Sequence, residues 1–105
     1  MIQVIVTVED SVITGFELSG HSGFSDEGSD IVCAAVSSAA YMTANTVTDV
    51  QDLDCLLTVD DGFMKLSLSK PEAEAAQVIL NGFFLHINAL SQEYSQFIDL
   101  KISEV

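Results

Sequence analysis

The sequence predicts an α+β fold, a two-layer sandwich in which two helices pack on one face of a mixed, mainly antiparallel sheet of about five strands. The chain has 105 residues, which suits a single domain over residues 1–105 with one core. Its hydrophobic content of 49% and its single proline are typical of a compact folded chain. Apolar residues alternate in some segments and recur at helical spacing in others, in the order strand, strand, helix, strand, strand, helix, strand.

The first two strands form a predicted hairpin. Residues 1–9 alternate between apolar and polar side chains, which is typical of a half-buried strand. Residues 9–11 suit a short turn into a second strand at residues 12–19, in which Phe16 and Leu18 share a face.

An aperiodic segment and a helix follow. Residues 22–29 contain two glycines and one aromatic, Phe24, which indicates a loop. Ser29 or Asp30 suits a helix N-cap, and the alanine-rich run to about residue 48 is apolar on most sides. We therefore expect this helix to be buried on more than one side.

Two strands form a second hairpin, and one more strand ends the chain. Residues 56–59 and 63–68 are separated by a turn that contains Asp61 and Gly62, a pair that strongly favours a tight hairpin. Residues 97–103 alternate again and predict the last strand.

The second helix is predicted between these strands. Pro71 suits its first turn, and Ser69 with Glu72 fits a capping box. Apolar residues then recur at helical spacing to about residue 96. Gly82 costs about 1 kcal/mol relative to alanine in such a helix, so we expect it to mark close packing.

The charge limits the partners of this chain. Sixteen acidic residues against three basic ones give a formal net charge of -13, which repels nucleic acids and anionic membrane surfaces and favours basic proteins or peptides. The sequence shows neither a secretory signal nor a long uninterrupted apolar run. We expect a cytoplasmic protein with reduced cysteines.

His21 and Cys33 flank the expected start of the first helix. A cysteine at a helix N-terminus beside an imidazole is a setting for thiol catalysis, because unpaired amides and a nearby base favour the thiolate. Asp30, Cys33 and Ser37 also share one face of the helix. The alternative is structural: Cys33 as a small buried side chain, Asp30 as a cap, and Ser37 bonded to a backbone carbonyl.

Two features bear on this choice. Strand alternation would point His21 away from the face of Phe16, unless Gly20 interrupts the alternation. The spacing of His21, Cys33 and Cys55 matches no standard zinc pattern, so we expect neither a metal nor another cofactor.

At this point the chain resembles the ribosomal-processing cysteine protease family, the Prp or YsxB-like proteins. The resemblance covers the whole chain and is carried by Gly20-His21 and by the run Gly28-Ser29-Asp30-Ile31-Val32-Cys33-Ala34-Ala35-Val36-Ser37. Ser22 stands where the family commonly has alanine.

The resemblance implies a cysteine endopeptidase that removes the N-terminal extension of a bacterial large-subunit ribosomal protein, cutting after paired aromatic residues. It implies Cys33 as nucleophile, His21 as general base, supporting roles for Gly20, Asp30 and Ser37, and a homodimer. We expect the loop to act as a lid over the site: Ser22, Gly23, Phe24, Ser25, Asp26, Glu27, Gly28 and Ser29. The helix-start amides, including that of Cys33, are the expected oxyanion donors.

A second hypothesis is a non-catalytic acidic module that binds a basic ribosomal protein during assembly. It predicts that replacing Cys33 affects packing alone. In either case we expect Cys55 in the core, and His86 facing solvent or a subunit partner.

Overall fold

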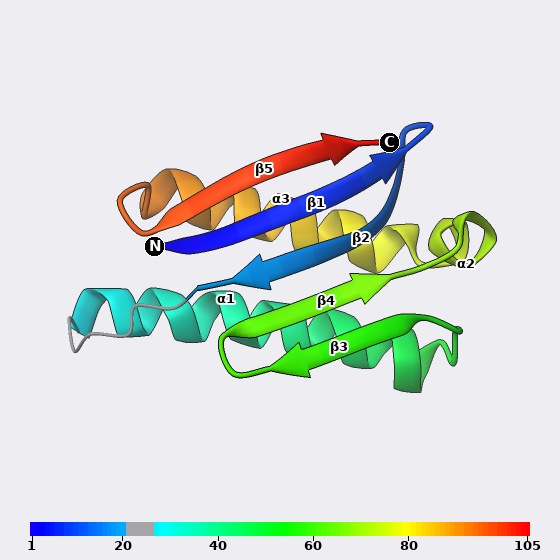
Figure 1. The fold of residues 1–105 in the computed structure, drawn as a ribbon, viewed down its shortest axis with the longest axis horizontal. Helices are drawn as coiled ribbons and strands as arrows, with labels where there is room; N and C mark the ends of the chain where they lie inside the picture. Colours follow the sequence, from blue (N-terminus) through cyan, green and yellow to red (C-terminus); the bar gives the residue numbers. More distant parts are fainter. Residues whose placement is uncertain (21–26) are drawn as a thin grey trace.

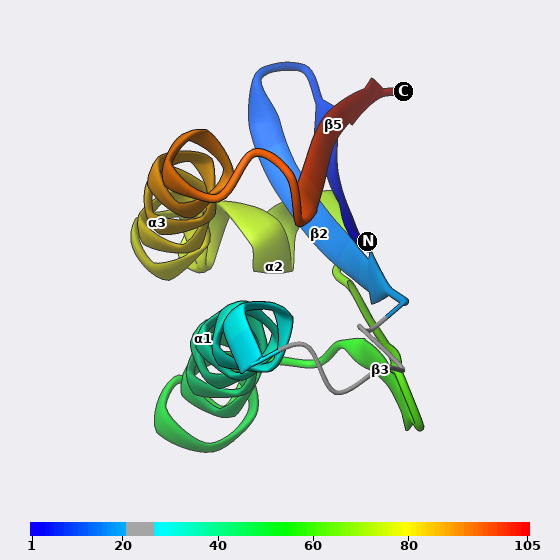
Figure 2. The same ribbon diagram turned by 90° about the vertical axis from the view of Figure 1, so that its left-hand side faces the viewer.

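In a computed structural model, one five-stranded sheet is covered on one face by a layer of helices (Figures 1 and 2). The structure describes residues 1–20 and 27–105, with the backbone alone for residues 27–30. The strands are β1 (Ile2–Glu9), β2 (Val12–Ser19), β3 (Leu56–Asp60), β4 (Phe63–Ser67) and β5 (Ile98–Glu104). The helices are α1 (Glu27–Asn45), a π-helical turn (Thr46–Val50), α2 (Lys70–Ala75) and α3 (Gln77–Glu93).

The sheet has the order β3-β4-β2-β1-β5. Strand β1 pairs with β2 in antiparallel fashion and with β5 in parallel fashion, while β4 pairs antiparallel with both β2 and β3. The sheet is thus mixed and mainly antiparallel, and the predicted fold class is confirmed. Asp10 and Ser11 both adopt positive φ angles, 50° and 66°, as a tight turn between β1 and β2 requires.

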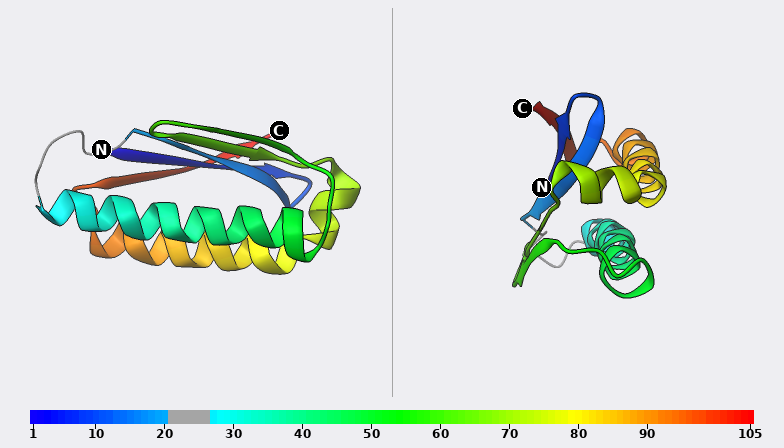
Figure 3. Two further views of the ribbon diagram at one scale, coloured as in Figure 1. Left: turned by 90° about the horizontal axis from the view of Figure 1, so that it is seen from below. Right: turned by 90° about the vertical axis from the view of Figure 1, so that its right-hand side faces the viewer.

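The two long helices lie side by side under the sheet (Figure 3). Each buries one stripe: α1 contributes Val32, Val36, Ala40, Ala44 and the following Val47, and α3 contributes Leu80, Phe83 and Ile87. By length and hydropathy Ile31–Val50 could also cross a membrane, but its apolar stripe belongs to this core. Phe83 stacks on Phe16 of β2 with ring centroids 4.3 Å apart.

The second helical segment is divided, which corrects the expectation of one helix. Helix α2 ends at Ala75, and α3 begins at Gln77. The side-chain Nε2 of Gln77 donates to the carbonyl oxygens of Ile13 and Ala73 at 2.7 and 2.8 Å. The side-chain Oε1 of Gln77 accepts a hydrogen bond from the backbone N–H of Ile13 at 3.1 Å. The break therefore coincides with a side chain that joins the start of α3 to β2.

Two local expectations for this segment are wrong. Ser69 occupies the N-cap position of α2, but its side chain makes no capping hydrogen bond, so the capping box is absent. Gly82 is exposed, and a Cβ built on it would meet no atom within 4 Å, so it does not mark close packing. The first helix also ends earlier than expected, because the π-helical turn replaces its last residues from Thr46 onward.

Candidate functional site

The regular strand geometry of the first hairpin ends at Gly20. Strand β2 stops at Ser19, and Gly20 adopts a φ of +80° that favours glycine. A Cβ at this position would lie 2.7 Å from the carbonyl oxygen of Met1, and the Gly20 N–H donates to the carbonyl of Gly62 at 3.1 Å. The strand therefore ends before His21, which is the alternative that the sequence left open at Gly20.

His21 itself lies outside the described residues, as does the predicted lid from Ser22 to Asp26. The last three residues assigned to the lid, 27–29, instead form the first turn of α1, which corrects that boundary. Six residues, 21–26, connect Gly20 to α1, and the end of β2 lies at the same end of the molecule as the start of α1 (Figures 1 and 2).

The earlier start of α1 changes the chemistry expected at Cys33. Because the helix begins at Glu27, Asp30 is not its N-cap, and Cys33 lies in the second turn. An amide there donates to the carbonyl four residues earlier, and the effect of the helix dipole falls off beyond the first turn. The expectation of a free Cys33 amide as an oxyanion donor is therefore wrong.

Cys33 and Ser37 lie together on one border of the buried stripe of α1. Both are half-buried, and Cys33 packs against the core. Each follows a fully buried valine by one residue. The N-terminal part of α1 lies at the end of the molecule where β3 turns into β4 (Figure 1).

Few groups in this protein can take a proton from Cys33 or balance its negative charge. The chain contains three basic residues, and all are lysines on other elements: Lys65 in β4, Lys70 in α2 and Lys101 in β5. Lys65 lies opposite Glu17, on the face of the sheet away from the helices. His86 is exposed on α3, away from its buried stripe. Among the histidine and lysine side chains, this leaves His21 as the candidate base.

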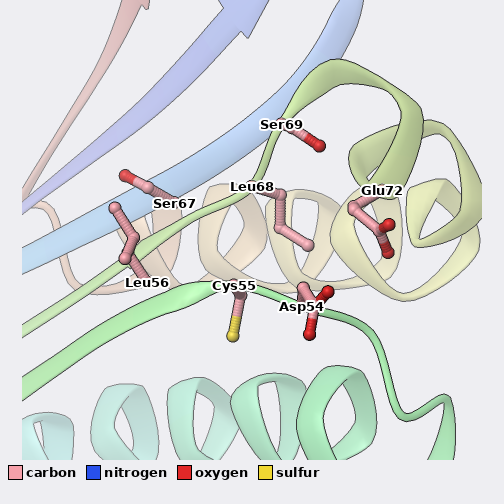
Figure 4. A pocket seen from close by; sticks show the side chains of 7 residues that line it. All are labelled: Asp54, Cys55, Leu56, Ser67, Leu68, Ser69 and Glu72. Atoms are coloured by element: carbon pink, nitrogen blue, oxygen red, sulfur yellow. The ribbon is translucent and has the colours of Figure 1, made fainter.

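Cys55 lies just before β3, at the margin of the core rather than inside it. It is half-buried and lines a hollow of about 460 Å³ with Asp54, Leu56, Ser67, Leu68, Ser69 and Glu72. In Figure 4 its sulfur points toward α1, whereas Leu56 points the other way. Burial, and then the Asp54 carboxylate, raise the pKa of the Cys55 thiol. Within residues 1–20 and 27–105, no cluster of His, Cys, Asp and Glu could hold a metal ion.

The first long helix of this two-layer α+β domain carries a half-buried cysteine, and the segment before the helix carries a histidine, which are the two residue types that thiol catalysis uses. Residues 1–99 match the family described as Cysteine protease Prp. The chain belongs to this family and is a cysteine protease.

Relatives support this assignment over most of the chain. The ribosomal processing cysteine protease Prp of Bacillus subtilis (strain 168) is 29% identical over 91 residues, 81% of each chain. The protein of the same name from Staphylococcus aureus (strain Mu50 / ATCC 700699) is 27% identical over 103 residues, 95% of this chain and 97% of the relative.

Solved structures are also similar. A Streptococcus mutans protein superposes with a TM-score of 0.90 at 32% identity, covering 100% of this chain and 96% of that one. The S. aureus ribosomal processing protease Prp, crystallised with a substrate peptide, superposes with a TM-score of 0.88 at 25% identity, covering 98% and 100%.

Proposed function

We propose that this protease removes the N-terminal extension of a bacterial large-subunit ribosomal protein by cutting after paired aromatic residues, with Cys33 and His21 as a catalytic dyad. The curated relatives carry the name of ribosomal processing proteases. Crystal structures of the S. aureus relative contain a substrate peptide and, separately, a covalently linked product peptide.

The chemistry follows from a thiol and one base. His21 takes the proton of the Cys33 thiol, and the sulfur attacks the scissile carbonyl carbon. The tetrahedral intermediate collapses when the C–N bond breaks and the imidazolium of His21 protonates the leaving amine. The thioester is then hydrolysed by a water that His21 deprotonates, which releases the new carboxyl end and restores the thiol.

The observation that carries the proposal is the distribution of bases around Cys33. None of the three lysines lies on α1, and His86 is exposed on α3. Gly20 breaks the strand one residue before His21, at the end of the molecule where α1 begins. Both observations support His21 as the base that acts on Cys33. Ser37, which lies on the same border of α1 as Cys33, and Asp30, three residues before Cys33 in the same helix, are the proposed supporting residues of this site.

Two further features belong to this proposal. The protease acts in the cytoplasm, where ribosomal proteins are made, and it works as a homodimer, as the family resemblance implies. Its net charge of -13 favours encounter with a basic ribosomal protein.

The test is incubation of the purified protein with the precursor ribosomal protein encoded by the same genome. We expect wild type to remove the extension, and Cys33→Ala and His21→Ala to lower kcat by at least about 100-fold, the usual size of a lost nucleophile or general base. Cleavage products are identified by mass spectrometry.

Matched controls use the second copy of each residue type. Cys55→Ala and His86→Ala should cleave at close to the wild-type rate, because Cys55 lies just before β3 and His86 lies on α3, both on other elements than Cys33. Full activity in Cys33→Ala or His21→Ala would overturn the dyad. Tight binding of the precursor without cleavage by wild type would instead favour the acidic binding module.

A further inference from the structure

The helix-facing side of β3 is apolar but uncovered. Strand β3 lies at one edge of the sheet. Its Leu57 and Val59 lie opposite Leu66 and Met64 of β4, and directly paired residues share a face of a sheet. On β4 these side chains are 1% and 3% exposed, whereas Leu57 and Val59 are 39% and 47% exposed. The core therefore ends between β4 and β3.

This surface continues toward the end of the molecule where α1, the helix that carries Cys33, begins. The turn between β3 and β4 is joined to the chain before His21 by the hydrogen bond from Gly20 to Gly62. The start of α1, the helix that carries Cys33, lies at the same end of the molecule as this turn (Figure 1). An extended chain that follows β3 toward this turn therefore approaches the end of α1 that carries Cys33.

The ends of β3 are acidic. Asp52 and Asp54 precede the strand, Asp60 is its last residue and Asp61 follows it, all with exposed side chains. In the described part of the chain the two ion pairs join Lys70 to Asp10 and Lys101 to Asp99, so these four carboxylates have no cationic partner there. Their field favours positive charge at both ends of whatever covers β3.

We infer that an extended segment of the substrate adds to the free edge of β3, with apolar side chains at alternate positions on Leu57 and Val59 and basic residues beside the flanking aspartates. The inference rests on the proposed function. Strand addition satisfies the unpaired backbone groups of the sheet edge, while the alternate side chains supply selectivity. Part of the substrate selectivity of the protease would then depend on substrate residues that lie outside the scissile bond.

A second copy of this chain fits the same edge poorly. Two copies paired through β3 would place the four aspartates of each close to those of the other, and each copy carries a net charge of -13. Like charges across a strand pair are destabilising. The observations therefore favour a basic segment as the occupant.

The experiment compares two adjacent leucines on opposite faces of β3. Leu57→Asn places an amide on the helix-facing side, and Leu56→Asn makes the same change on the outer face, where Leu56 is 77% exposed. Each is assayed with a long peptide that spans the extension and the following ten residues, and with a short peptide limited to the residues next to the cut. We expect Leu57→Asn to lower kcat/KM for the long peptide about tenfold, mainly through KM, with Leu56→Asn unchanged.

The outcomes separate this inference from the function on which it rests. Equal values for the two variants would overturn the inference while leaving the protease function intact. An equal loss on the long and short peptides would also overturn it, because it would indicate a distorted catalytic site. Conversion of a dimer to a monomer by Leu57→Asn alone would identify β3 as an interface between copies. Absence of cleavage by wild type would contradict the proposed function itself.

The charge requirement is tested separately. Asp54→Asn should lower kcat/KM for the long peptide at low ionic strength, and added salt should reduce the difference from wild type. Glu104→Gln, on the opposite edge strand β5, is the matched control and should have no effect. A loss of activity that depends neither on salt nor on basic residues in the peptide would contradict the basic character of the segment.

Discussion

β3 and β4 are neighbouring strands of equal length, yet one is part of the core and the other is not. Both place apolar side chains on the helix-facing side of the sheet at alternate paired positions. The β4 side chains are buried, and their partners on β3 remain exposed. The difference arises from the width of the two layers, because two helices side by side cover about 20 Å whereas five strands span about 24 Å.

This comparison shows that an alternating pattern indicates which side of a strand is apolar but not whether that side is covered. On β4 the pattern contributes to the core. On β3 the apolar side chains stay exposed at an edge of the sheet, where a partner can contact them. Substitutions in the two strands should therefore differ, stability responding on β4 and activity on β3.

The largest expected effect is on stability at the paired leucines. Leu66→Ala should lower the free energy of unfolding by about 3 kcal/mol, because it leaves a cavity in the core, whereas Leu57→Ala should cost less than about 1 kcal/mol. Urea denaturation of the two variants measures this difference. Similar losses in both would show that β3 is covered in solution.

A second test concerns how closely the backbones of β2 and β4 pack in the part of the sheet that the helices cover. Gly15 of β2 is buried, and a Cβ there would lie 2.1 Å from the carbonyl oxygen of Leu66. Gly15→Ala should therefore cost about 2 kcal/mol or more through overpacking and displacement of β4. The readout is again the free energy of unfolding.

Gly82→Ala is the matched control for that change. This helical glycine has open space around its Cβ position, so alanine should stabilise the protein by about 0.5 to 1 kcal/mol. A destabilised Gly82→Ala variant, or a Gly15→Ala variant as stable as wild type, would contradict the packing described for these two positions.

The smallest expected effect is on the reactivity of the Cys55 thiol, which lies just before β3 at the margin of the core. Its pKa is raised by burial and then by Asp54, so the folded state disfavours the thiolate. In a Cys33→Ala background, Cys55 should react with iodoacetamide more slowly than a free cysteine near pH 8. Its contribution to stability is present below the unfolded thiol pKa of about 8.5 and is lost as the pH rises above it.

Asp54→Asn sharpens this last test. Removal of the carboxylate should lower the pKa of Cys55 and speed its alkylation modestly, with burial still opposing the thiolate. An alkylation rate in the folded protein equal to that in urea would show that neither burial nor Asp54 acts on this thiol.

Much of the fold was predictable because periodicity reports directly on local geometry. The alternation in residues 1–9 and the Asp61-Gly62 turn placed the strands and the second hairpin correctly. Helix ends were less predictable. Gly28, Ser29 and Asp30 suited a loop and a cap, but the backbone is already helical there. The division before Gln77 depends on hydrogen bonds to Ile13, 64 residues away in sequence.

The sequence by itself determined the fold class, the candidate thiol and the candidate base, because these depend on residue type, spacing and resemblance. The tertiary structure was needed to show that Cys33 lies in the second turn of α1 and that Gly20 ends the strand before His21. It also decided that the apolar side of β3 is left open. Such features depend on contacts between segments far apart in the chain, which no local pattern records.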